Sequence, residues 1–142
     1  MKEFTVLVVD DEDEFREVTT KILSKRGLQV QGAESGEKAL AILEHSRIDV
    51  VLLDVKMPGM DGIETLRQIR SRKPLVEVVL LTGHASVESG IEGMKLGAFD
   101  YLMKPIDIEP LLEKLSGAYD KKRLHQEKIE QAQLKKHMAM PV

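Results

Sequence analysis

The chain has 142 residues, of which 21 are Lys or Arg and 24 are Asp or Glu, so its formal net charge at pH 7 is −3. One domain is the simplest organisation for this length, and a mildly acidic balance argues against direct nucleic-acid binding by this segment. The absence of cysteine excludes disulfides and thiolate metal sites. No signal-peptide pattern or membrane-length apolar run is found, so we expect a cytoplasmic protein without a membrane partner.

Apolar runs of strand length alternate with amphipathic runs of helical period along the chain. The first strand is expected at 4–9, and the helix after it ends at Gly27. The inward face of that helix is predicted to carry Phe15, Val18, Ile22 and Leu23. A weaker run at 28–33 alternates apolar and polar residues, as an edge strand does. Ser35 then caps a helix that is predicted to bury Ala39, Leu40 and Leu43.

The run at 48–54 is apolar on both faces, which is typical of a central strand in a parallel sheet, and it ends on Asp54. The next helix begins at Asp61-Gly62, closes before Pro74 and is predicted to bury Ile63, Leu66 and Ile69. A fourth strand at 76–81 leads to Thr82. The helix after it ends at Gly97 and is predicted to turn Val87, Ile91 and Met94 inward.

A fifth strand at 99–103 stops at Lys104-Pro105, and a last helix is expected to bury Ile108, Leu111, Leu112 and Leu115. Five strand–helix units with short connections predict an α/β fold with a parallel sheet covered on both faces. The unit count favours the flavodoxin-like doubly wound (βα)5 sandwich, whose five strands have the order 2-1-3-4-5.

The character of the sequence changes near residue 119. We therefore expect one domain at 4–118 and a charged helical extension or linker at 119–142. Leu124, Ile129 and Leu134 do not share one helical face, so no strong coiled-coil seam is present. The extension is either a frayed end of the last helix, or a linker or weak dimer helix that leads toward an output domain.

The carboxyl ends of parallel strands meet at one edge of a sheet. Here those ends carry Asp10, Asp11, Asp54, Thr82 and Lys104. Each residue alone is common at a turn or helix start, but a purely structural sheet does not call for all of them on one edge. Crowded carboxylates need a cation, and Mg²⁺ (or Mn²⁺) favours such oxygen ligands. The arrangement suits attack by Asp54 on a phosphorus atom.

Lys104 is expected to pair with a carboxylate or phosphoryl oxygen as a mobile point charge. A cis peptide bond before Pro105 would aim this lysine inward, although trans is the commoner state of any X-Pro bond.

Four motifs carry a resemblance to a known family: VVDD at 8–11, LDVKMPGMDG at 53–62, LTG at 81–83 and GAFDYLMKP at 97–105. Together they resemble the receiver domain of two-component response regulators, over about residues 4–118. The last motif, with Asp107 after it, is most similar to receivers of ATPase-type transcriptional activator regulators.

The resemblance implies that Asp54 accepts a phosphoryl group from a sensor histidine kinase. It also implies that Asp11, Asp54 and the backbone carbonyl of Lys56 ligate Mg²⁺, with Asp10 acting through water. Such a domain is not an enzyme in its own right, although it assists its own phosphorylation and dephosphorylation.

By the same resemblance, Thr82 and Tyr101 form a switch pair that changes the surface of the fourth helix, fifth strand and fifth helix. That surface controls an output domain or protein partner. If the extension at 119–142 is a weak dimer helix, we expect a phosphorylation-dependent homodimer. Lys56 and His84 stand at positions that tune the lifetime of the phosphoryl group.

Other classes fit the residues less well. A haloacid-dehalogenase-like phosphatase needs an aspartate two residues after its nucleophile, where this chain has Lys56. No Gly-x-x-x-x-Gly-Lys-Ser/Thr loop for a nucleoside triphosphate is present. A flavin site would need a hydroxyl-rich loop after the first strand, and that loop is acidic. A receiver-like scaffold that binds partners without phosphorylation is the remaining alternative.

Overall fold

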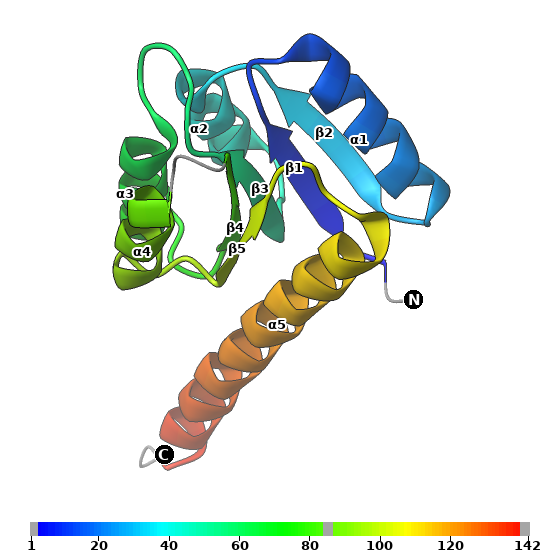
Figure 1. Ribbon diagram of the computed structural model, residues 1–142. Coiled ribbons are helices and arrows are strands. Elements are labelled where there is room, and N and C mark those ends of the chain that lie inside the picture. The colour runs from blue at the N-terminus through cyan, green and yellow to red at the C-terminus, as the bar shows by residue number, and fades with distance from the viewer. Residues whose placement is uncertain (1–2, 84–86, 140–142) are drawn as a thin grey trace.

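Five parallel strands form one sheet in the order β2-β1-β3-β4-β5, as the alternating pattern predicted, and helices cover both of its faces (Figure 1). The computed structural model describes residues 3–83 and 87–139. The strands are β1 Thr5–Val9, β2 Gln29–Ala33, β3 Val50–Asp54, β4 Glu77–Thr82 and β5 Asp100–Met103. The helices are α1 Asp13–Lys25, α2 Gly36–His45, α3 Gly62–Arg72, α4 Val87–Lys95 and α5 Ile108–Met138. None of the helices in the described ranges is long and apolar enough to cross a membrane.

The alternation of side chains along the strands divides the interior into two hydrophobic cores. Leu7 and Leu53 point to one face, where they meet residues of α2 and α3. Val8 and Leu52 point to the other face, where they meet residues of α1 and α5. Because β1, β3 and β4 are covered on both faces, they are apolar almost throughout, which is the pattern that identified the central strand in the sequence.

The predicted inward faces of α2 and α3 are confirmed. Ala39, Leu40 and Leu43 are buried in α2, and the Ser35 hydroxyl accepts a hydrogen bond from the Lys38 backbone N–H at 3.1 Å, as a helix cap does.

The predicted face of α1 is partly wrong. Leu23 is buried together with Thr19, four residues earlier, whereas Val18 and Ile22 remain 49% and 39% exposed. Helix α1 is rotated about its own axis so that Thr19 and Leu23 face the sheet. Val18 and Ile22, which lie beside them, face outward.

The predicted face of α4 is also wrong for its described side chains, since Ile91 and Met94 are 51% and 39% exposed. The helix approaches the sheet through Gly90 and Gly93 instead. A Cβ atom on Gly93 would lie within van der Waals overlap of the Leu80 side chain. Glycine allows this close approach, so the apolar side chains of α4 are left on its outer surface.

Helix α5 continues without a break to Met138 and extends well beyond the sheet (Figure 1). Contacts with the domain continue past residue 118. The Tyr119 ring stacks on Phe4 with 4.7 Å between centroids, and the Lys122 ammonium is 2.5 Å from the Asp49 carboxylate. Asp49 also accepts a hydrogen bond from the Thr5 backbone N–H. From residue 128 to 139 every side chain is exposed.

Glu77 is the first residue of β4 and lies at the amino-terminal edge of the sheet. Its carboxylate is buried without a hydrogen-bond partner among the described residues. Its side chain is 1% exposed, and neither carboxylate oxygen accepts a hydrogen bond within the described residues. Lys121 and Arg70 approach it only to 3.7 Å and 3.8 Å. Burial raises the pKa of Glu77 above its ordinary value, and the positive charges of Lys121, Arg70 and His125 oppose this only in part.

We predict that Glu77 makes the domain less stable as pH rises. The folded state holds the Glu77 proton more tightly than the unfolded chain does. The free energy of unfolding therefore falls as pH rises from 4.5 through the raised pKa of Glu77, and this loss is constant at higher pH. The free energy of unfolding of Glu77→Gln, taken relative to that of wild type, should therefore rise by on the order of 1 kcal/mol between about pH 5 and about pH 8. Urea unfolding at both pH values measures this difference. The exposed Glu34→Gln serves as the control, and parallel behaviour of Glu77→Gln and wild type would contradict the prediction.

Candidate functional site

The site is built at the carboxyl edge of the sheet, where β1 and β3 end beside each other. Asp54 is the last residue of β3, and its side chain is only 6% exposed. The first residue of α3, Gly62, lies directly against this strand end. A Cβ atom there would fall into the backbone carbonyl oxygen of Asp54. A glycine at this position therefore lets α3 begin close to the strand and supports the loop that follows Asp54.

Asp10 follows β1 and is completely buried, yet all its polar atoms have partners. Its backbone N–H donates to the Ala33 carbonyl at 3.1 Å. One carboxylate oxygen accepts from the Glu12 backbone N–H at 2.9 Å, and the other accepts from the Lys104 ammonium at 2.8 Å. Asp11, the next residue, is exposed and projects toward the same region.

The three aspartates expected to converge do so. Ligand oxygens of Asp10, Asp11 and Asp54 all lie within 4.8 Å of one another. Carboxylate oxygens at this separation are hard ligands of the kind that Mg²⁺ and Mn²⁺ prefer, and such an ion would offset the repulsion among the three acids. The residues present therefore fit a divalent cation.

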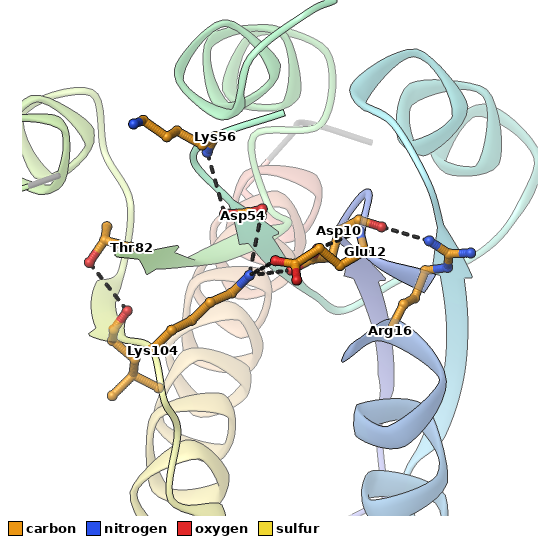
Figure 2. Close-up of polar contacts among 8 residues, drawn as sticks. Asp10, Glu12, Arg16, Asp54, Lys56, Thr82 and Lys104 are labelled. Atoms are coloured by element: carbon orange, nitrogen blue, oxygen red, sulfur yellow. Dashed lines mark hydrogen bonds and ion pairs between the residues drawn. The ribbon is translucent and has the colours of Figure 1, made fainter. Parts of the chain in front are cut away.

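Lys104 projects into this acidic cluster from the end of β5 (Figure 2). Its ammonium is 2.8 Å from Asp10, 3.3 Å from Glu12 and 3.7 Å from Asp54. It also lies 4.4 Å from the centre of the Phe15 ring, a distance at which the ring face attracts a cation. The Lys104-Pro105 peptide bond is cis.

The charges of this cluster alter two pKa values in the same direction for different reasons. Burial, and then the charge of Asp10, raise the pKa of Asp54 to about 6, while Lys104 and the Lys56 backbone N–H work against the rise. For Lys104, burial alone would lower the pKa, but the hydrogen bond to Asp10 and the negative charges around it raise the pKa above its ordinary value. Lys104 is thus a fixed positive charge near neutral pH, and Asp54 is mostly ionised there.

Thr82 and Tyr101 lie apart from the acids in this state. The Thr82 hydroxyl donates to the Leu102 carbonyl at 3.4 Å, on the neighbouring strand, and no hydrogen bond joins it to Asp54 within the described residues. Tyr101 is 38% exposed, with its ring against Gly90 of α4.

Lys56 contributes its backbone to the site rather than its side chain. Its N–H donates to the Asp54 carboxylate at 3.3 Å, while its ammonium points away from the acids (Figure 2). His84, the other position expected to tune the phosphoryl lifetime, lies outside the described residues.

The sequence analysis missed three contacts from the start of α1: Glu12 and Phe15 with Lys104, and Arg16 with Asp10. Phe15 had been assigned only to the core, and Arg16 had no role. Their position within one helical turn of the Asp10-Asp11 pair was the available signal, because the first turn after a strand end faces that end.

Comparison with known proteins identifies this arrangement. Residues 6–116 match the family model of the response regulator receiver domain. The chain belongs to this family. Receivers of two-component systems are signalling domains, and both the strand order 2-1-3-4-5 and the acidic edge of this chain agree with that assignment.

Relatives of this receiver include the regulatory protein AtoC of Escherichia coli, which is 40% identical over 106 residues, covering 75% of this chain and 23% of AtoC. The transcriptional regulatory protein ZraR of Salmonella typhimurium is 41% identical over 113 residues, covering 80% of this chain and 26% of ZraR. The chain thus spans about a quarter of the length of these relatives.

Solved structures give the same result. A receiver domain protein from Clostridium thermocellum is 36% identical, with a TM-score of 0.81 and coverage of 85% of this chain and 98% of that one. NtrX from Brucella abortus is 30% identical, with a TM-score of 0.84 and coverage of 89% and 29%.

The pKa of Asp54 in this receiver should move in opposite directions in two variants. Asp10→Asn removes the neighbouring negative charge and should lower the pKa from about 6, whereas Lys104→Met removes the opposing positive charge and should raise it. Titration of the side-chain carboxyl carbon by NMR, in metal-free protein, measures both shifts. Asp61→Asn, which keeps the hydrogen-bonding cap of α3, is the control. Shifts of the same sign in the first two variants would refute this electrostatic account.

Proposed function

We propose that this receiver accepts a phosphoryl group on Asp54 from a phosphohistidine of a sensor histidine kinase. The observation that supports the proposal most directly is the convergence of Asp10, Asp11, Asp54 and Lys104 at one sheet edge. Three acids and one ammonium, drawn from three strand ends, suit the stabilisation of a transferring phosphoryl group better than any structural role.

In the proposed reaction, an ionised Asp54 oxygen attacks the phosphorus atom. The bond from phosphorus to the imidazole nitrogen breaks, its electron pair stays on that nitrogen, and an acyl phosphate forms on Asp54. With a pKa of about 6, the carboxylate is ionised at neutral pH and yet more basic than an ordinary aspartate. Lys104, 3.7 Å from Asp54, is placed to meet the negative charge on the transferred oxygens.

Mg²⁺ or Mn²⁺, when held by Asp11, Asp54 and the Lys56 backbone carbonyl, with Asp10 acting through water, supplies further positive charge at the phosphoryl oxygens. Asp10 is oriented for this by its bonds to Glu12 and Lys104. Through the same groups the domain assists its own phosphorylation and dephosphorylation. Lys56, two residues after Asp54, and His84, two residues after Thr82, are proposed to set how quickly water removes the phosphoryl group.

The switch is proposed to work by competition for the Thr82 hydroxyl. A phosphoryl oxygen on Asp54 is a stronger acceptor than the Leu102 carbonyl, whose bond to Thr82 is long at 3.4 Å. When Thr82 turns toward the phosphoryl group, that link between β4 and β5 is lost beside Tyr101. Tyr101 then turns inward from its position against Gly90, which biases the surface of α4, β5 and α5 toward a second arrangement.

This surface has the composition of a partner site. Ile91 and Met94 of α4 and Tyr101 and Met103 of β5 are all exposed apolar side chains. We propose that it controls an output domain or protein partner, as in ATPase-type transcriptional activator regulators, and that this segment itself does not bind nucleic acid. The site of action is the cytoplasm, where ATP is available to charge a kinase.

Phosphorylation is tested with acetyl phosphate, with and without Mg²⁺, and intact-protein mass as the readout. Wild type should gain the mass of one phosphoryl group only with Mg²⁺, and Asp54→Ala should gain none. Asp61→Asn, which lies close to the site and retains its helix cap, should behave as wild type. Equal modification of Asp54→Ala and wild type would exclude Asp54 as the acceptor, and no modification of wild type would favour a scaffold that acts without phosphorylation.

The extension at 119–142 is proposed as a linker helix that pairs two copies upon activation. From residue 128 to 139 its side chains are exposed, and Leu134 and Met138 are 58% and 77% exposed. Beryllofluoride, which mimics the phosphoryl group, should shift wild type from monomer to dimer in sizing chromatography with light scattering. Removal of the exposed helical turns by truncation after Gln126 should reduce that shift, and an unchanged monomer in wild type would exclude the dimer.

A further inference from the structure

We propose that Arg16 is a positioning residue for the metal-binding carboxylates, and that it acts by holding the peptide group between Asp10 and Asp11. The inference deepens the proposed phosphoryl-acceptor function and rests on it. Arg16 touches neither the acceptor Asp54 nor any carboxylate of the three-aspartate cluster. It acts through the backbone that carries two of these acids.

The guanidinium of Arg16 joins the end of β1 to the start of α1. Its Nη1 donates to the backbone carbonyl of Asp10 at 2.7 Å (Figure 2). Its Nη2 is 2.6 Å from the Asp13 carboxylate. The loop between these two contacts contains Asp11. Only 18% of the Arg16 side chain is exposed, so Arg16 is more deeply buried than the long side chain of a typical surface ion pair, although Asp13 is 79% exposed.

The stem of Arg16 lies against β2, the edge strand. A Cβ atom on Gly32 would come within 3.1 Å of Arg16 Cδ and 3.2 Å of its Cγ. A glycine at this position therefore leaves the space that the arginine stem occupies. Three elements, β1, α1 and β2, together determine where the guanidinium lies.

Asp11 depends on this arrangement more than Asp10 does. The carboxylate of Asp10 is held by Glu12 and Lys104 whether or not Arg16 is present. In contrast, the exposed carboxylate of Asp11 makes no hydrogen bond or ion pair within residues 3–83 and 87–139. Its direction is set by its backbone, and the peptide plane places the Asp10 carbonyl and the Asp11 N–H on one rigid unit. Holding that carbonyl therefore fixes the peptide plane from which Asp11 starts and restricts the directions that its carboxylate can take toward Asp10 and Asp54.

It is also chemically favourable that Arg16 donates its hydrogen bond to the backbone carbonyl of Asp10. Because Arg16 binds a carbonyl rather than a carboxylate of the cluster, it leaves the aspartate oxygens free for an ion. Asp13 balances its charge, so the guanidinium does not add a net positive charge next to the cation site. Groups that orient metal ligands in this way typically contribute about 10–100-fold to metal affinity.

The test is calorimetric titration of Mg²⁺ into the metal-free full chain. Arg16→Met should raise the Mg²⁺ dissociation constant about 10-fold. Arg16→Lys, which keeps one donor, should recover part of the affinity. Asp13→Asn leaves the bond to the carbonyl but removes the charge that balances the guanidinium, so it should weaken Mg²⁺ binding less than Arg16→Met does. Arg26→Met is the matched control, since Arg26 lies at the carboxyl end of α1, away from the site, and also pairs with an acid, Glu109.

A purely structural role is separated from a positioning role by two further measurements. Gly32→Ala crowds the arginine stem and should weaken Mg²⁺ binding although Arg16 is retained. In acetyl phosphate reactions, Arg16→Met should need more Mg²⁺ for half-maximal rate and approach the wild-type rate when Mg²⁺ saturates. If Arg16→Met does not fold, Arg16→Lys and Gly32→Ala carry the test.

An unchanged Mg²⁺ dissociation constant in Arg16→Met, or an equal loss in Arg26→Met, would overturn the inference. The titration involves no phosphoryl transfer, so its result is independent of the proposed function. Wild type that binds Mg²⁺ but is never modified on Asp54 would refute the proposed function alone. Normal phosphorylation of wild type, with Mg²⁺ affinity indifferent to Arg16, would refute the positioning role alone.

Discussion

Repulsion among carboxylates at the carboxyl edge of the sheet is the constraint on which the rest of this receiver depends. Asp10 and Asp54 are buried, and Asp11 lies beside them. Among the residues that the structure describes, only Lys104 brings a positive charge within 4 Å of the carboxylates of both buried acids. The balance is incomplete, because the pKa of Asp54 is still raised to about 6. A bound cation or additional hydrogen-bond donors would reduce the remaining repulsion among these carboxylates. The fold therefore keeps its chemical centre in a state that ligands can stabilise.

At the opposite, amino-terminal edge of the sheet, one buried carboxylate is closely paired. Lys122 and Asp49 form a buried ion pair there, which fastens α5 to the sheet. This pair joins the first half of the long helix to the strands, whereas every side chain from residue 128 to 139 is exposed. Strands β3 and β4 run from this edge to the edge that carries Asp54, so the strands that contact α5 also reach the acidic cluster.

Among its described side chains, helix α4 buries none of the large apolar ones. It contacts the sheet through Gly90 and Gly93 and turns Ile91 and Met94 outward, so it buries little apolar surface of its own. Hydrophobic burial contributes about 25 cal/mol per Å² of apolar area, and a helix that gives up this contribution moves at a lower cost. The arrangement agrees with a role in which α4, next to Tyr101, changes position when the acceptor site changes charge.

The sequence by itself determined the order of the elements, the parallel sheet and the acids at its edge. These follow from local patterns: a strand apolar on both faces is central, and the residue that ends it lies at the edge whatever the neighbours are. Tertiary structure alone decided which side of α1 and α4 is buried, because Val18 and Ile91 are exposed where Thr19 and Gly90 approach the sheet. It also decided that Arg16 reaches the Asp10 carbonyl and that Lys122 reaches Asp49. Such contacts depend on how closely two backbones approach, and that distance is set by the packing of the whole chain rather than by any one segment.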